Sequence, residues 1–200
     1  QIYRASEIDG AGVITSLALQ YFYSTSQNRN MDIYLGHTDK SSFSSNTVDW
    51  VPSSDLTLVY SGTVSFNNSG DDNWLTIDLQ QSFEYNGEDN LVLVVDDNHG
   101  SYYNNTERFY THQSGTENVA MYAYKDGTNF DPNNPPTSVN GRTSVRNNLK
   151  LNGQCIGSSD CERSNLVVMD VTSNSAKLIY ALGVGATGIE LQYGIEGSDY

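Results

Sequence analysis

Positive charge is scarce in this chain of 200 residues: ten Lys and Arg stand against twenty-four Asp and Glu, which gives a formal net charge of −14. A negative field of this size repels a phosphate backbone, so we expect no nucleic-acid partner. The same excess of carboxylates attracts cations, and loops rich in hard oxygen ligands suit calcium.

Long apolar runs are also lacking. No stretch approaches the roughly 18 consecutive apolar residues that a membrane-spanning helix needs, so we expect no membrane insertion. The chain starts at Gln1, without an initiator Met or an apolar leader. We therefore expect a processed or excised piece of a longer protein.

Cysteine occurs only twice, as Cys155 and Cys161 in CIGSSDC. Two thiols this close in a Gly/Ser-rich loop can close a small disulfide ring. A zinc site would need two more nitrogen or sulfur ligands, and the three scattered histidines supply no suitable spacing. The residues predict a disulfide; two free thiols remain the alternative, because ring closure depends on geometry.

Helical signals are missing, and strand signals fill the chain. No segment combines a 3.6-residue amphipathic period with helix caps. Instead, alternating apolar runs are separated by NN, SG, NG and PP turn signals at short intervals, which is typical of an antiparallel sandwich or barrel. The fold class is predicted to be all-β, with strands at 12–23, 31–38, 56–66, 74–79, 91–95, 108–113, 118–126 and 147–152.

The chain is predicted to contain two domains. The proline-rich stretch 131–142 (DPNNPPTSVNGR) lacks the donors of a central strand and is expected to be a long crossover loop. After it, VRNNLKLNG forms the last strand of a first domain at 1–153. A linker at 154–160 leads to a second unit at 161–200, with strand-like runs NLVVMDVT, SAKLIYA and IELQYG. Three strands are too few to close a sandwich, so we expect this unit to pack on the first domain or to self-associate.

Two ordered sets of segments resemble known families. SEIDGAGVITSL, MDIYLGHTDKSSF, DWVPSSDLTLVYSG, WLTIDL, FEYNGEDNLVLVVDDN and GRTSVRNNLKLNG follow one another in the first 153 residues. Together they resemble the cleaved-adhesin-type modules of secreted and surface proteins of Bacteroidetes, such as the gingipains. NLVVMDVTSNSAKLIYA and IELQYG resemble the opening strands of a fibronectin type III domain, with Tyr180 where a core Trp is usual. The resemblance implies a jelly-roll β-sandwich followed by a partial Ig-like unit, in a secreted or cell-surface multidomain bacterial protein.

The stretch LVLVVDDNHG leads a buried strand directly into Asp96, Asp97 and Asn98. As a catalytic dyad the two aspartates are poorly placed, because adjacent strand residues point to opposite faces. No nucleophile accompanies His99, and no GxSxG motif occurs. We therefore expect no catalytic residues and no enzyme activity.

The same stretch could instead bind calcium, or it could simply be a polar turn at the end of a strand. It lacks the D-x-D-x-D-G pattern of an EF-hand. Structural calcium is nevertheless implied by the resemblance, because similar jelly-roll modules often bind calcium in their loops. The candidate ligands are Asp96, Asp97, Asn98, Glu7, Asp9, Asp71 and Asp72.

Aromatic residues in polar surroundings provide a candidate sugar-binding face, because flat Tyr and Trp rings stack on pyranose faces. In NVAMYAYKD, Met121 and Ala123 share one face of the predicted strand and the tyrosines share the other. Packing between two sheets is the alternative role for such rings. The candidates are Tyr102, Tyr103, Tyr122, Tyr124 and Trp74.

The combined expectation is a non-catalytic, adhesin-like binding module that recognises a glycan or a host or matrix protein. The alternative is a structural spacer or accessory domain of a secreted protease or glycosidase.

Overall fold

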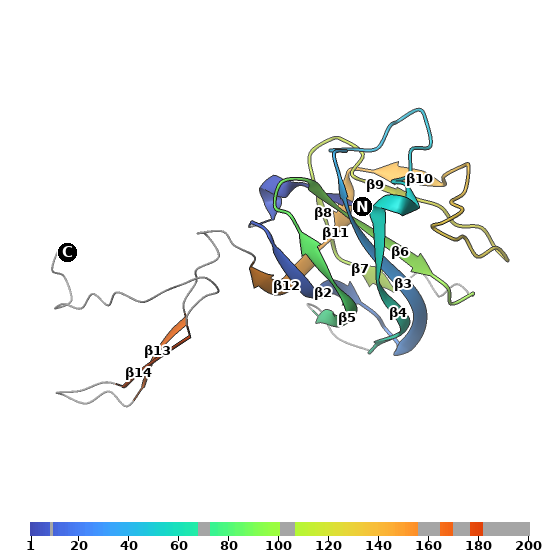
Figure 1. Ribbon diagram of the computed structural model, residues 1–200. Coiled ribbons are helices and arrows are strands. Elements are labelled where there is room, and N and C mark those ends of the chain that lie inside the picture. The colour runs from blue at the N-terminus through green and yellow to red at the C-terminus, as the bar shows by residue number, and fades with distance from the viewer. Residues whose placement is uncertain (9, 68–72, 101–106, 156–164, 170–176, 182–200) are drawn as a thin grey trace. The chain divides into compact units, whose positions relative to one another are not determined.

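The computed structural model describes residues 1–8, 10–67, 73–100, 107–155, 165–169 and 177–181 (Figure 1). These residues form antiparallel strands and two short 3-10 turns, η1 (Ala5–Glu7) and η2 (Ser53–Asp55), and they contain no α-helix. The prediction of an all-β antiparallel fold is confirmed. The chain divides into two compact units, Gln1–Gln154 and Cys155–Tyr200.

One sheet of the first unit has the order β1-β6-β3-β4, with β1 at Ile2–Tyr3, β6 at Asn90–Asp97, β3 at Gln27–Thr38 and β4 at Leu56–Phe66. All neighbours in it are antiparallel. Strand β6 extends beyond the apolar run LVLVV, because β3 continues alongside it until Met31 lies opposite Asp97. Asp96 and Asp97, for which a polar turn was one of the two alternatives, are therefore strand residues.

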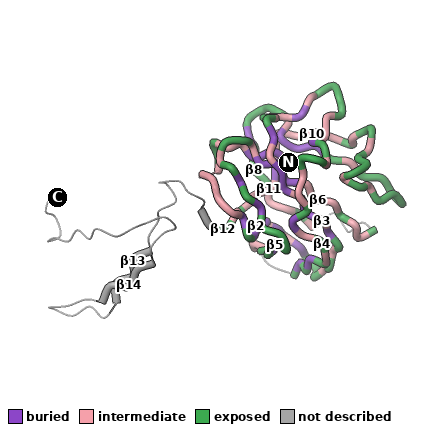
Figure 2. The backbone as a smooth tube through the Cα atoms, viewed as in Figure 1, coloured by how far each residue is buried: buried purple, intermediate pink, exposed green. Residues whose placement is uncertain are grey.

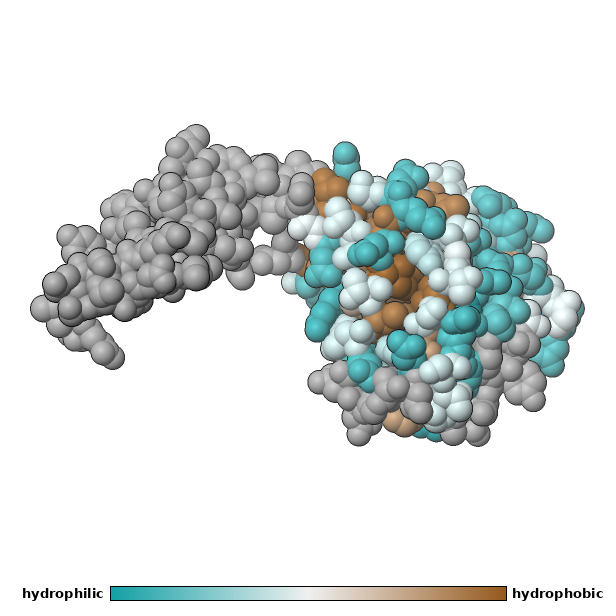
Figure 3. All heavy atoms as spheres, turned by 90° about the horizontal axis from the view of Figure 1, so that it is seen from below, coloured by the Kyte–Doolittle hydropathy of each residue, from teal (hydrophilic) through white to brown (hydrophobic). Residues whose placement is uncertain are grey.

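The second sheet has the order β12-β2-β5, with β12 at Leu149–Cys155, β2 at Gly12–Phe22 and β5 at Asn73–Tyr85; β7 (Arg108–Phe109) also pairs with β2. Apolar residues from both sheets meet in one buried core, which makes the unit a β-sandwich. Figure 2 shows the buried backbone positions concentrated along β2, β3 and β6. At the face drawn in Figure 3, apolar atoms in the middle are surrounded by hydrophilic ones.

Two small sheets complete this unit: β8 (Thr111–Gln113) pairs with β11 (Val145–Asn147), and β9 (Ala120–Tyr122) pairs with β10 (Gly141–Thr143). A second apolar cluster lies on the outer face of β6, because Val92 points away from the core that Leu91 and Leu93 fill. Its other buried members are Ile2, Phe43, Val51 and Met121. This outer cluster positions the candidate site.

In the second unit, β13 (Asn165–Met169) pairs with β14 (Lys177–Ala181) in an antiparallel hairpin, with Val167 opposite Ile179. The third predicted run, 189–194, lies outside the described residues. The jelly-roll topology, the fibronectin-like assignment and self-association through this unit stay predictions.

Candidate ligand-binding site

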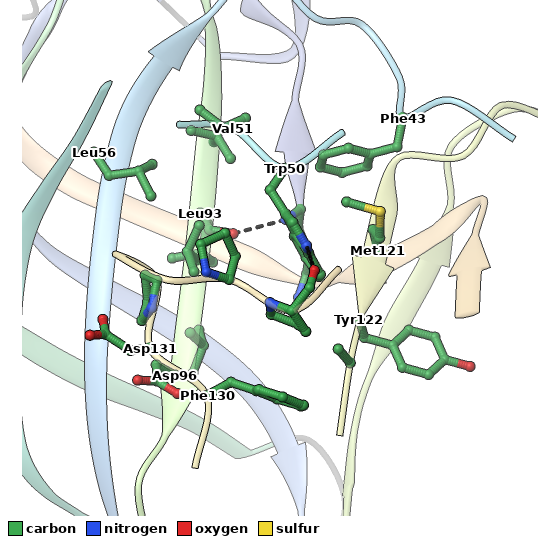
Figure 4. A pocket seen from close by; sticks show the side chains of 18 residues that line it. Phe43, Trp50, Val51, Leu56, Leu93, Asp96, Met121, Tyr122, Phe130 and Asp131 are labelled. Atoms are coloured by element: carbon green, nitrogen blue, oxygen red, sulfur yellow. Dashed lines mark hydrogen bonds between the residues drawn. The ribbon is translucent and has the colours of Figure 1, made fainter. Parts of the chain in front are cut away.

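A hollow of about 240 Å³ lies over the outer face of β6. Val92 and Val94 line it from the strand, and Trp50, Met121 and Phe130 line it from other segments (Figure 4). Sites for drug-sized ligands span roughly 300–1,000 Å³. A hollow of this size suits one small ring of a ligand.

The wall opposite β6 comes from the proline-rich segment 130–136. Pro132, Pro135 and Pro136 line the hollow. The indole Nε1 of Trp50 donates a hydrogen bond to the backbone oxygen of Pro136 at 2.8 Å, which fixes the segment to the indole. Because proline restricts the backbone, this wall is stiff before any ligand arrives.

Two carboxylates, Asp96 and Asp131, line the same hollow and lie next to each other in Figure 4. Burial, together with the negative charges of Asp32, Asp131 and Asp97, raises the pKa of Asp96 to about 6. Asp131 is oriented by Asn133, whose backbone N–H donates to Asp131 Oδ1 at 2.8 Å. The hollow therefore combines apolar walls with fixed hydrogen-bond acceptors.

Asn98 connects this end of β6 to its surroundings. Its Nδ2 donates to Asp32 Oδ2 at 3.1 Å, and its Oδ1 accepts from Asn129 Nδ2 at 2.6 Å. These bonds tie β3, β6 and the segment that precedes Phe130 together. In the described structure, Asn98 supports the wall of the hollow.

Tyr122 and Tyr124 form an exposed pair of parallel rings, with centroids 6.4 Å apart and an interplanar angle of 4°. They are 49% and 67% exposed, while Met121, which belongs to β9 and to the outer cluster, is buried. The predicted alternation of this segment is therefore observed. Tyr122 also lines the hollow, and the ring of Tyr124 is stacked beside it.

The backbone around the tyrosine pair is fixed by the neighbouring strand. Tyr122 lies opposite Gly141 in the ladder, and a Cβ at Gly141 would come within 2.4 Å of the Tyr122 hydroxyl oxygen. The ring thus lies over the bare glycine. The side-chain oxygen of Asn140 accepts a hydrogen bond from the backbone N–H of Tyr124 at 2.7 Å. The backbone N–H of Asn140 donates to the backbone oxygen of Tyr122 at 3.0 Å.

Of the other predicted aromatic residues, the structure describes Trp74, which is not brought to this place. Trp74 is on β5 in the second sheet, where the Lys150 ammonium lies 3.8 Å from its ring centroid in a cation–π contact. Tyr102 and Tyr103 lie outside the described residues.

Several predicted calcium ligands have other partners. Glu7 forms an ion pair with the buried Arg146 and accepts a hydrogen bond from the Arg4 N–H at 2.8 Å. Asp97 forms an ion pair with Arg29. Among the described residues, no group of three or more His, Cys, Asp or Glu side chains is placed to hold a metal. Asp9, Asp71 and Asp72 lie outside those residues, so calcium stays a prediction.

The proposed disulfide also stays a prediction, because Cys161 lies outside the described residues. The described part of the chain contains no helix with the length and hydropathy to span a bilayer.

Sequence reasoning missed several residues of the hollow: Asp32 beside it, and Trp50, Phe130 and Asp131 in its lining. One signal was available. DWVPSS and NFDPNNPP both place an aromatic residue beside an acid and a proline within a loop, which is unusual in a purely solvated connection.

In comparisons with family models, curated proteins and solved structures, the chain has no significant match.

Proposed function

We propose that the first unit is a non-catalytic carbohydrate-binding module of adhesin-like type, which holds a glycan across the tyrosine pair and the hollow beside it. The observation that carries this proposal is the parallel, exposed arrangement of Tyr122, which lines the hollow, and Tyr124, whose ring is stacked beside it. Flat rings of this kind pack against the C–H face of a pyranose, while Tyr hydroxyls and carboxylates bond to sugar hydroxyls.

The hydrogen bonds that order the site in the absence of a ligand also support the proposal. The Trp50–Pro136 bond and the Asn140 bonds fix the two sides of the site before a ligand binds. A prearranged site loses less conformational entropy on binding. In the proposed setting the module belongs to a secreted or cell-surface bacterial protein and attaches it to a glycan of a host or of an extracellular matrix.

A glycan array with the 200-residue chain tests the proposal. We expect binding to a restricted set of glycans, a loss of at least tenfold in affinity for Tyr124→Ala, and retention of affinity for Tyr124→Phe, which keeps the ring. Trp74→Ala is the matched aromatic control and should bind normally, because that ring is on the other sheet. Absence of binding to every glycan would favour the structural spacer instead.

The non-catalytic part is tested in the same experiment. Two neighbouring carboxylates in a hollow are also the equipment of a glycosidase. Glycans recovered after long incubation should be intact. Shortened products that disappear in Asp96→Asn would overturn the assignment as a binding module.

A further inference from the structure

The charge of the hollow is one-sided. Asp96 and Asp131 line it, and none of the described residues that line it is Lys, Arg or His. Gln1 also lines it, but burial, together with the charge of Arg146, lowers the pKa of its amino group to about 5, so this amine is uncharged at pH 7. Asp32 lies directly opposite Asp96 in the ladder and adds a third carboxylate beside the same end. The remaining lining is mainly aliphatic, aromatic and proline side chains.

A neutral ligand would leave this negative charge uncompensated in partly desolvated surroundings, which is unfavourable. A ligand with a positive charge at this end would gain from all three carboxylates. Phe130 lines the same hollow as Asp96 and Asp131, and an aromatic ring there can interact with a cation through its face. The hollow is therefore complementary to a small, mostly apolar ring that carries a cationic group.

The tyrosine pair extends the site in another direction. In Figure 4 the Tyr122 ring lies on the opposite side of the hollow from Asp131 and is directed away from the cavity. One ring can therefore occupy the hollow while a further ring of the same ligand packs against Tyr122 and Tyr124. This arrangement fits an oligosaccharide better than a monosaccharide.

We propose that the hollow selects an amino sugar with a free, protonated amine, within an oligosaccharide whose neighbouring ring packs on Tyr122 and Tyr124. The selection rests on the proposed function, because it names which sugar class the same site takes. The amine lies between Asp96 and Asp131, and the ring carbons contact Val94, Trp50 and Phe130. N-acetylation would remove the charge and add bulk, so it would abolish the selection.

The experiment compares three tetrasaccharides with the same β-1,4 linkage by isothermal titration at pH 7: glucosamine, N-acetylglucosamine and glucose units. We expect the glucosamine form to bind at least tenfold more tightly than the other two. Asp96→Asn and Asp131→Asn should each reduce this preference severalfold, with a melting temperature no lower than that of the unaltered chain as a check on folding. Asp78→Asn, which removes an exposed carboxylate of the second sheet, is the matched charge control and should keep the preference.

Each result has one meaning. Equal binding of charged and neutral tetrasaccharides overturns the selection for an amine but leaves carbohydrate binding intact. A preference that persists in the Asp96→Asn, Asp131→Asn double variant also overturns it, because the overall charge of −14 would then be the cause. If no oligosaccharide of any kind binds, here or on the array, the proposed function itself fails.

Discussion

Asp96 on β6 lies directly opposite Asp32 on β3 in the antiparallel ladder. Like charges facing each other across a ladder destabilise a sheet. Asp131, from the proline-rich segment, adds a further negative charge near Asp96 and contributes to the raised pKa of its carboxyl. Placing three carboxylates close together lowers the stability of the folded unit. Local destabilisation of this kind is typical of binding sites.

The raised pKa of Asp96 predicts how stability depends on pH. Its pKa rises from 3.8 in the unfolded chain to about 6 in the folded unit, so ionisation opposes folding. The resulting penalty is absent below pH 3.8 and grows as pH rises toward 6, where it is nearly complete. Because the carboxyl is only half-buried, solvent screening limits the penalty to about 1 kcal/mol.

Asp96→Asn should therefore stabilise the protein by about 1 kcal/mol at pH 7 and have almost no effect near pH 3.5. Urea unfolding of both proteins at several pH values measures the difference, in which the other titrating groups cancel. Asp97→Asn, which removes the partner of Arg29, should be neutral or destabilising at pH 7. A constant difference across the pH range would mean that Asp96 ionises normally.

The buried Arg146 should be essential to the first unit. Its guanidinium is paired with Glu7, donates to the Ile2 oxygen at 2.6 Å and lies 4.6 Å from the Tyr3 ring centroid. Arg146→Ala removes the ion pair, the hydrogen bond and the cation–π contact together and should destabilise the unit by about 3–5 kcal/mol. Arg4→Ala breaks the more exposed ion pair with Glu117 and should cost at most about 1 kcal/mol. Similar losses of unfolding free energy for both variants would contradict a structural role of the buried pair.

Gly141 offers a way to disturb the tyrosine pair without removing a ring. In Gly141→Ala the new Cβ would lie 2.4 Å from the Tyr122 hydroxyl oxygen, so the ring must move. Because this atom is the free end of an exposed side chain, we expect a stability change below about 1 kcal/mol. Glycan affinity should nevertheless fall severalfold.

A double-variant comparison shows whether the ring is responsible. In a Tyr122→Ala background, Gly141→Ala should have no further effect on glycan affinity. An equal loss of glycan affinity in both backgrounds would mean that Gly141→Ala does not act through the Tyr122 ring.

Calcium binding, proposed from the acidic composition and the resemblance, is tested by thermal unfolding with calcium and with EDTA. A ligand that binds only the folded state stabilises it by about 2.7 kcal/mol at a hundredfold excess over its dissociation constant. We expect the melting temperature to fall by several degrees in EDTA and to recover with calcium but not with sodium. Identical melting curves, with no metal in elemental analysis, would remove calcium from the account.

Features that depend on residues close together in the sequence could be predicted from it. Alternation of apolar and polar residues predicts the strands at 12–23 and 56–66, and β2 and β4 cover nearly the same residues. It also predicts that Met121 and Tyr122 point to opposite faces, and in the structure Met121 is buried while Tyr122 is exposed. Turn signals separate these strands, and the prolines at 132–136 lie between β9 and β10, because proline cannot join a central ladder.

Features that depend on long-range pairing could not be predicted. That Asp32 faces Asp96 follows from the register of β3 with β6, which are more than fifty residues apart in sequence. The same register extends β6 through Asp97. Likewise, two residues that line the hollow, Trp50 and Pro136, are 86 positions apart in sequence and are joined by a hydrogen bond. The sequence alone does not distinguish an aspartate that lies in a turn after a strand from one that lines a cavity.

The most direct test is to map the glycan-binding surface by NMR. The strongest ligand from the array would be titrated into isotope-labelled protein while the backbone amide shifts are followed. We predict that the shifts concentrate on 120–124, on 130–136 and at the end of β6 near Asp96. Shifts centred on the second sheet around Trp74, or no shifts with any glycan, would contradict the account.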